Sequence, residues 1–225
     1  MELDQIRTLF AGRDLEWVVP VDPIFTAVLI PVIEKDGELQ ILFEVRSGSI
    51  AQGGEVCFPG GHLETGEDAR EAAVRETCEE LLVDPSQVEM IAPMHRLIDR
   101  GRLVVDSFLG VLHDYNGIYS EDEVSSIFTV PLSQFLEREP EEYDAALIIK
   151  PGNDFPFDLL PGGRDYPFFQ HTKKFYFYRM KPVIWGLTAE ILYHCIQVLL
   201  LTPGGHSGSA SSRQMPPPQI IVNML

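Results

Sequence analysis

The spacing of apolar and polar residues predicts strands and helices in a mixed order. Short apolar runs rich in Val, Ile, Leu and Phe, bounded by Gly, Pro or Asp, are typical of buried strands. The Asp36-Gly37 pair between two such runs favours a tight hairpin turn. We therefore expect strands at 25–33, 39–45, 55–58, 88–97, 103–112, 126–130, 145–149 and 175–179.

Four helices complete the expected element order. An amphipathic segment covers 3–13, and an acidic segment that follows the glycine-rich turn at 59–61 ends near Leu82. Pro131 opens a short third helix, because proline is tolerated in a first helical turn. The fourth helix covers 185–201. This order predicts an α/β fold, with a mixed sheet and helices on both sides of it.

The composition of the chain changes after the last expected helix. The chain has 225 residues, enough for one sizeable domain with a complete core, which we expect to cover residues 1–201. From Thr202 onward the sequence is rich in Gly, Ser and Pro and of low complexity. Residues 202–225 are therefore expected to form a disordered tail.

Charge and cysteine content exclude several classes of function. The net charge of −17 argues against a general nucleic-acid binder and against binding to an anionic membrane. No apolar run is long enough to span a membrane, and the first residues do not resemble a signal peptide. The three cysteines have no metal-finger spacing, which favours reduced thiols and a cytoplasmic location over a catalytic thiol.

Three glutamates of the acidic segment gather on one side of the expected helix. A helix advances about 100° per residue, so Glu80 lies roughly 40° from Glu76, and Glu79 lies about 60° away on its other side. Carboxylate oxygens are hard ligands that suit Mg²⁺ or Mn²⁺. Beside a glycine-rich loop, such a cluster favours chemistry on a phosphate-bearing substrate. The alternative is a solvated acidic face that binds nothing.

The same geometry predicts the surroundings of these glutamates. Arg75 precedes Glu79 by one helical turn and can pair with it. Thr65 and Asp68 offer a capping signal for the start of the helix. We expect a buried stripe on the opposite side, and small residues near Glu76 that leave its carboxylate accessible. These are Val74, Cys78 and Leu81 for the stripe, and Ala69, Ala72 and Ala73 for the small residues.

The stretch 61–83 resembles the Nudix box, the signature of the Nudix hydrolases. Two positions depart from the pattern: Thr77 replaces an aliphatic residue, and Leu82 replaces the final glycine. The second departure alters how the helix ends, since glycine is the usual residue past a helix C-terminus. The matching positions are Gly61, Glu67, Arg75, Glu76, Glu79, Glu80 and Val83.

The resemblance implies a Nudix α/β/α sandwich in which the box forms a loop-helix-loop beside a mixed sheet. It implies Mg²⁺ or Mn²⁺ as the cofactor, held by three glutamates and a loop carbonyl, and catalytic roles for three box residues. Glu123, before the expected strand at 126–130, is our candidate for a further acid that acts as base or ligand; the alternative is a solvent-exposed position. The implied metal ligands are Glu76, Glu79, Glu80 and Gly60, and the implied catalytic residues are Glu76, Glu79 and Arg75.

The residues before the box resemble the coenzyme A pyrophosphatase branch of this family. The stretch 43–61 reads FEVRSGSIAQGGEVCFPGG, in which an Arg-Ser pair and an aliphatic residue at position 50 precede GEVCFPGG. The segments 121–136 and 184–192 resemble later parts of the same branch. The resemblance implies hydrolysis of coenzyme A to 3′,5′-adenosine bisphosphate and 4′-phosphopantetheine. The implied substrate-binding residues are Arg46, Ser47, Phe58 and Gly60.

Several alternatives stay open at this stage. Arg46 can be a surface strand residue, Phe58 a core aromatic residue, and Trp185 is expected to anchor the core. The substrate can be ADP-ribose, NADH or another nucleoside diphosphate derivative, or the domain can be a nucleotide sensor without catalysis. A small nucleotide is the expected partner, with neither nucleic acid nor membrane, and a homodimer is one oligomeric state that the sequence leaves open.

Overall fold

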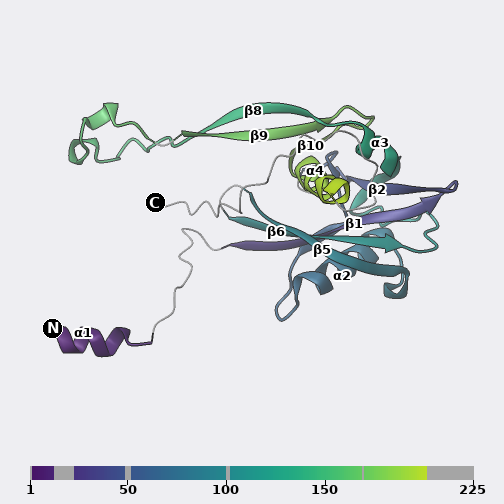
Figure 1. Ribbon diagram of the computed structural model, residues 1–225, viewed down its shortest axis with the longest axis horizontal. Coiled ribbons are helices and arrows are strands. Elements are labelled where there is room, and N and C mark those ends of the chain that lie inside the picture. Colours follow the sequence, from purple (N-terminus) through teal and green to yellow (C-terminus); the bar gives the residue numbers. More distant parts are fainter. Residues whose placement is uncertain (1, 13–22, 49–51, 100–101, 169, 202–225) are drawn as a thin grey trace.

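A mixed seven-stranded sheet forms the centre of the computed structural model, which describes residues 2–12, 23–48, 52–99, 102–168 and 170–201 (Figure 1). The strand order is β3-β2-β1-β6-β5, with β4 also paired to β1 and β7 to β2. Strands β1 and β6 run parallel, while the other strand pairs described are antiparallel. The strands are β1 (Ile24–Lys35), β2 (Glu38–Arg46), β3 (Val56–Cys57), β4 (Gly60–His62), β5 (Val88–Asp99), β6 (Leu103–Leu112) and β7 (Val124–Pro131).

Helices cover both faces of this sheet, as the sequence predicts. On one face, Phe43 of β2 packs in a large apolar cluster with Leu192 of α4. On the other face, Leu42 packs with Leu81 of α2. Figure 1 shows α2 and α4 on opposite sides of the strands. The helices are α1 (Leu3–Phe10), α2 (Ala69–Leu81), α3 (Leu132–Glu137) and α4 (Gly186–Leu201), with a short 3₁₀ helix, η1 (Pro85–Gln87).

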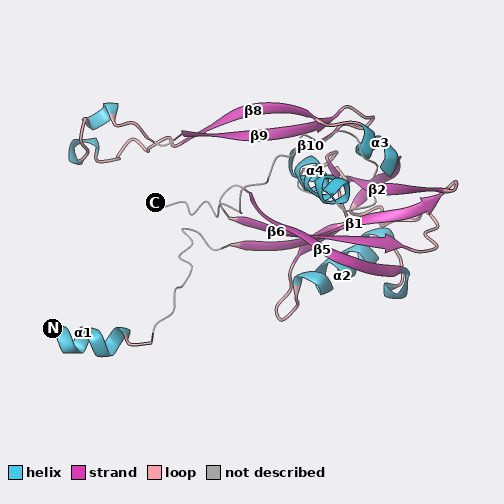
Figure 2. Cartoon of the chain, viewed as in Figure 1, coloured by secondary structure: helices cyan, strands magenta, loops and turns pink. Residues whose placement is uncertain are grey.

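A second sheet, which the sequence did not predict, has the order β10-β9-β8. It consists of β8 (Glu141–Ile148), β9 (Gln170–Tyr178) and β10 (Ile184–Trp185), and Figure 2 shows β8 and β9 as a long hairpin that extends past the larger sheet. The expected strands at 145–149 and 175–179 cover only part of this hairpin. Its remaining positions carry charged residues that pair across the strands, such as Lys174 with Glu142 at 2.6 Å, instead of an apolar pattern. Two short 3₁₀ helices, η2 (Phe157–Leu159) and η3 (Gly163–Asp165), lie between β8 and β9.

Trp185 is not the core anchor that we expected. Its side chain is 42% exposed and stacks on Phe177 of the second sheet, with ring centroids 5.8 Å apart. The chain then turns through Gly186, whose φ of 64° favours glycine, into α4. There the buried Thr188 hydroxyl donates a hydrogen bond of 2.9 Å to the Val56 carbonyl. This contact fixes α4 against β3, directly before the glycine-rich turn.

Helix α2 begins at a different residue from the one expected. Asp68, not Thr65, is the N-cap: its carboxylate accepts hydrogen bonds from the backbone of Arg70 and Glu71. The Glu71 side chain accepts from the Asp68 backbone in return, which completes a capping box. The start of the helix is therefore held by two acidic side chains near its positive dipole end.

The buried side of α2 also differs from the expected stripe. Leu81 is buried, but Val74 and Cys78 are only half-buried. The fully buried Ala72 and Ala73 pack against Ala27 of β1. We expected these alanines to leave the Glu76 carboxylate accessible, but they face the sheet instead. They let the helix lie close to the sheet.

Thr77 lies on the same buried side, at the position where the Nudix pattern has an aliphatic residue. Its hydroxyl donates a hydrogen bond of 2.6 Å to the Ala73 carbonyl one turn earlier in the helix. The buried polar atom is thus satisfied inside the helix, and the substitution leaves no unpaired group.

Two expectations lie outside the described residues: the aliphatic residue at position 50 and the tail at 202–225. None of the helices described has the length and apolar character of a membrane span.

The C-terminus of α2 contains a strained residue. Leu82 adopts a left-handed conformation with φ 50° and ψ 47°, and its backbone N–H donates to the Cys78 carbonyl. This conformation costs a residue with a Cβ about 1–2 kcal/mol. The side chain is 50% exposed, so little packing offsets that cost.

Replacement of Leu82 by glycine should therefore stabilise the protein. We expect Leu82→Gly to raise the free energy of unfolding by about 0.5–1 kcal/mol, the relief of strain exceeding the larger chain entropy that glycine gains on unfolding. Urea unfolding followed by circular dichroism measures this. Leu82→Ala keeps the strained conformation and should bring no gain. An equal gain from both variants would show that the backbone conformation is not the cause.

Candidate active site

The glycine-rich turn, helix α2 and the ends of β2 and β7 meet at one place. Strand β4 pairs with β1, which brings Gly60 and Gly61 beside the helix. At the other side, the Ser47 backbone N–H donates a hydrogen bond of 2.8 Å to the Glu123 carbonyl, which joins the end of β2 to the start of β7. Sequence positions that are far apart, including most of the predicted site residues, therefore share one neighbourhood.

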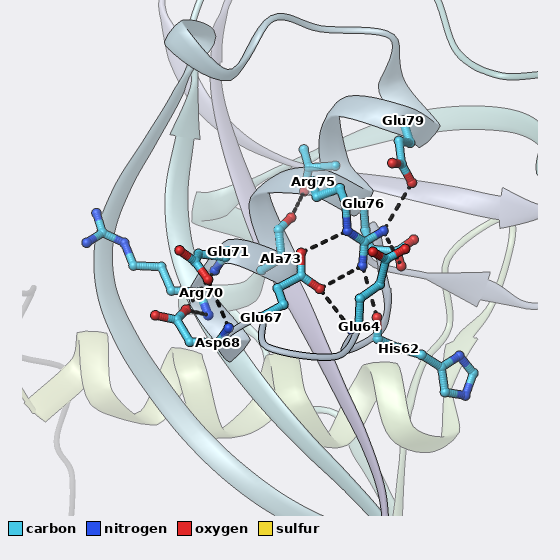
Figure 3. A network of polar contacts seen from close by, with 11 residues as sticks. His62, Glu64, Glu67, Asp68, Arg70, Glu71, Ala73, Arg75, Glu76 and Glu79 are labelled. Carbon is cyan, nitrogen blue, oxygen red and sulfur yellow. Dashed lines mark hydrogen bonds and ion pairs between the residues drawn. The ribbon is translucent and has the colours of Figure 1, made fainter.

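Arg75 holds the acidic residues of the box together (Figure 3). Its guanidinium forms two hydrogen bonds with Glu67, of 2.8 and 3.0 Å. It also donates to Glu76 at 2.9 Å, to Glu79 at 3.2 Å and to the His62 carbonyl at 3.0 Å. These hydrogen bonds raise the pKa of Arg75 and lower the pKa of Glu67. One cation thus ties the helix to β4 and to the loop that precedes α2.

Glu80 points from α2 toward the sheet. Its side chain is 4% exposed, and one carboxylate oxygen accepts a hydrogen bond of 2.8 Å from the Gly60 backbone N–H. Burial, together with the nearby charges of Glu76 and Glu123, raises the pKa of Glu80 to about 8 despite that hydrogen bond. The protein therefore keeps a carboxyl group where its ionised form is costly.

The two glycines of β4 are required by close contacts. A Cβ on Gly61 would lie 2.3 Å from a carboxylate oxygen of Glu76, and a Cβ on Gly60 would lie 2.2 Å from the Ala27 carbonyl oxygen. Gly61 thus leaves the space that the Glu76 carboxylate occupies. The sequence prediction assigned a carbonyl near Gly60 to a metal, whereas the contact that the structure describes at Gly60 is the N–H bond to Glu80.

Glu44 of β2 belongs to the same cluster, although sequence analysis missed it. The side chain is 1% exposed, and burial together with the charge of Glu80 raises its pKa. Arg46, two residues further along the strand, lowers the pKa of both Glu44 and Glu80, which places its positive charge beside them. A signal was present in the sequence, because Glu44 is the one charged residue in the predicted strand at 39–45.

Of the remaining predicted site residues, one lies in the core and the others lie at the edge of the acidic cluster. Phe58 is 3% exposed and stacks on Phe43 in the core, with ring centroids 5.1 Å apart, which favours the alternative of a core aromatic residue over a substrate contact. Arg46 and Ser47 are half-buried at the edge of the acidic cluster, and the exposed Glu123 raises the pKa of Glu76 and Glu80 through its charge. Glu79, whose side chain is 55% exposed, joins the cluster through Arg75.

The donor set fits a divalent cation, although no cage is preassembled. Within the described ranges, no three acidic, His or Cys side chains stand close enough together to enclose a metal ion. Glu76 is engaged by Arg75, and Glu80 by Gly60. Yet the cluster places several carboxylates near one another, and one buried oxygen, Oε1 of Glu44, has no hydrogen-bond partner among the described residues. A cation would relieve their mutual repulsion and pair that oxygen.

A groove of about 790 Å³ follows the outer side of α2 and is not the centre of this site. Its lining includes Glu67, Arg75 and Glu79 from the box, together with Val74 and other residues near the start of β5. Glu76, Glu80 and Arg46 do not line it. We therefore place the chemistry on the sheet side of α2 rather than in this groove.

The raised pKa of Glu80 predicts a pH-dependent stability for the metal-free protein. An unfolded Glu titrates near about 4.3, so between that pH and about 8 the folded state keeps a proton that the unfolded chain loses. The free energy of unfolding should therefore fall as the pH rises through this window. Glu80→Gln should flatten the profile, and its advantage over the wild type should grow to the order of 1 kcal/mol by about pH 8.5. Urea unfolding in EDTA across this range measures the effect, and parallel profiles would contradict it.

Comparison with known proteins places the chain in a family. Residues 23–150 match the model of the NUDIX domain. A peroxisomal coenzyme A diphosphatase of Mus musculus, NUDT7, is 35% identical over 132 residues, which cover 57% of this chain and 55% of that protein. The mitochondrial Nudix hydrolase 15 of Arabidopsis thaliana is 31% identical over 190 residues, 80% of this chain and 60% of that protein. Nudix hydrolase NudL of Escherichia coli K12 is 30% identical over 168 residues, 74% of this chain and 78% of that protein.

These matches agree with the geometry of the site. The chain spans between 49% and 60% of the length of the first four curated relatives that it matches. The match at 23–150 covers more than half of this chain and contains the glycine-rich turn, α2, Glu44 and Glu123. The chain therefore belongs to the Nudix family, and its mixed sheet between helices is the α/β fold expected from the box.

Proposed function

We propose that the protein hydrolyses a phosphoanhydride bond in coenzyme A or a derivative, giving 3′,5′-adenosine bisphosphate and 4′-phosphopantetheine. The observation that carries the proposal is that Glu76 and Glu80 of α2 lie near Glu123, whose backbone carbonyl accepts a hydrogen bond of 2.8 Å from Ser47, directly after Arg46. Support for the substrate comes from the stretch 43–61 and from the similarity to a relative named as a coenzyme A diphosphatase.

The residues of this chain have separable tasks in that reaction. A divalent cation, Mg²⁺ or Mn²⁺, held by Glu76, Glu79 and Glu80 would neutralise phosphate charge and lower the pKa of a bound water. Arg75 is a positioning residue, because its described contacts are all with box carboxylates and the His62 carbonyl.

Residues at the ends of β2 and β7 complete the proposed site. The guanidinium of Arg46 can hold a substrate phosphate by two hydrogen bonds, with the adjoining backbone of Ser47 beside it. Glu123 is exposed, and its charge acts on Glu76 and Glu80, so it can accept the proton of the attacking water. The Gly60 N–H orients Glu80.

The setting of the reaction is also a proposal. Cys57, Cys78 and Cys195 are free thiols, which favours a reducing compartment such as the cytoplasm. The relatives named above include peroxisomal and mitochondrial proteins, so fractionation of cells with an antibody against this chain decides the location. We propose a small nucleotide as the partner, and either a monomer or a homodimer as the assembly.

An assay of several substrates side by side tests the proposed function. With Mg²⁺ or Mn²⁺ present, we expect coenzyme A to be cleaved with a higher kcat/KM than ADP-ribose, NADH or dinucleoside polyphosphates. Glu80→Gln should lower kcat/KM by about 10²-fold or more while the fold is retained. Faster cleavage of ADP-ribose would assign the protein to another substrate class. Tight nucleotide binding without turnover would favour a sensor, and full activity of Glu80→Gln would exclude it as a metal ligand.

A substitution at Gly61 tests the role of the β4 backbone. The added methyl of Gly61→Ala would displace the Glu76 carboxylate, so we expect kcat/KM to fall by about 10²-fold, the usual effect of a small misplacement at a reacting centre. Product release measured by chromatography gives the rates. Gly152→Ala is the matched control, because its Cβ would meet only the Asp154 side chain at 3.0 Å. Equal activity of the two variants would show that the close approach at Gly61 is not needed.

A further inference from the structure

We propose that Glu44 is a fourth carboxylate of the cation site, contributed by the sheet, and that it holds a divalent cation between β2 and α2. The inference rests on the cation site of the proposed function and deepens it. The residues implied by the Nudix box all lie on α2 and the turn before it. Glu44 would extend the site across to the central sheet.

The alternation of side chains along β2 places Glu44 against the helix. Successive residues of a strand point to opposite faces. Leu42 packs with Leu81 of α2, while Phe43 packs in the cluster on the other face with α4. Glu44 is the next residue on the face of Leu42, so its side chain is directed toward α2, where Glu80 lies next to Leu81.

The contacts of Glu44 leave room for a ligand. Within the part of the chain that the structure describes, Oε2 accepts the weak thiol hydrogen bond of Cys57 at 3.9 Å and Oε1 has no partner. The side chain is 1% exposed, so water does not replace these partners freely. A buried carboxylate without hydrogen bonds is costly and is normally paired or bound to a metal.

The charged groups around Glu44 favour a cation over an ion pair inside the protein. Glu80 and Glu123 contribute negative charge, and Arg46 contributes the positive charge. The remaining titratable neighbours are the Cys57 thiol and Tyr115, and burial raises the pKa of both, so they carry no charge near neutral pH. Once Glu44 and Glu80 are ionised, three carboxylates face one guanidinium, and a divalent cation would balance this negative excess.

The alternative is that Glu44 stays protonated as a structural acid of the core. Burial raises its pKa and would allow this. The two cases differ in what a metal ion does. If Glu44 is a structural acid, its replacement should leave cation binding unchanged. If Glu44 is a ligand, its replacement should weaken cation binding.

Binding of Mn²⁺ to the full chain distinguishes these cases without an activity readout. After removal of metals with EDTA, calorimetric titration with Mn²⁺ near pH 8 gives the number of ions bound and their affinities for the wild type, Glu44→Gln and Glu44→Leu. We expect both variants to bind Mn²⁺ at least about 10-fold more weakly, or to lose one bound ion. Addition of Mn²⁺ should also raise the melting temperature of these variants less than that of the wild type.

The controls separate a lost ligand from a damaged fold. Glu190→Gln removes a half-buried carboxyl on α4, where Glu190 pairs with Lys173 at 3.4 Å on the other face of the sheet, and should bind Mn²⁺ as the wild type does. Glu44→Leu removes the unpaired oxygen together with the charge, so it should fold in EDTA even where Glu44→Gln does not. Wild-type affinity and stoichiometry in both Glu44 variants would overturn the proposal, as would a wild-type chain that binds no Mn²⁺.

The Mn²⁺ titration and the coenzyme A assay together test the two proposals separately. A wild-type chain that binds Mn²⁺ through Glu44 but leaves coenzyme A intact would support the cation site and refute the substrate. A chain that cleaves coenzyme A with Mn²⁺ while the Glu44 variants bind the ion normally would do the reverse.

Discussion

The close approach of the β4 backbone to helix α2 is the constraint on which the site depends. The Gly60 N–H contacts Glu80, the His62 carbonyl accepts from Arg75, and Gly61 leaves the space occupied by Glu76. Because β4 is itself paired to β1, these contacts fix the position of the acidic helix relative to the centre of the sheet. The buried alanines of α2 serve the same end, since larger side chains would push the helix away from β1.

The site concentrates like charges that the fold must hold in place. Arg75 neutralises the outer carboxylates by direct hydrogen bonds, and it does so at the helix surface. Glu80 and Glu44 lie deeper in the protein, and burial shifts the pKa of both carboxyl groups upward. The outer carboxylates are thus paired within the protein, while the inner carboxyl groups are stabilised by protonation or, as we propose, by a cation.

Much of this arrangement could be predicted from the sequence, because it is encoded locally. The box residues on α2 and the turn before it are neighbours in sequence, and helical spacing alone places Glu76, Glu79 and Glu80 together. The limits appear where side chains meet across strands. Glu44 stands out in the sequence as a charge within a predicted strand, but its position opposite α2 follows only from the packing of β2 against the helix. The second sheet was missed because its stabilising contacts are charge pairs and aromatic stacks between β8 and β9, which have no apolar periodicity.

The parallel pairing of β1 with β6 has a consequence for the order in which the molecule is built. The elements β2, β3, β4, α2 and β5 all lie between these two central strands in the chain, so pairing of β1 with β6 closes a long loop. Contacts between residues so distant in sequence slow folding, because loop closure costs entropy before the paired strands gain stabilising contacts. A nascent chain that stops before Leu103 therefore carries the acidic helix and β1, on which the helix packs, but lacks β6, the parallel partner of β1.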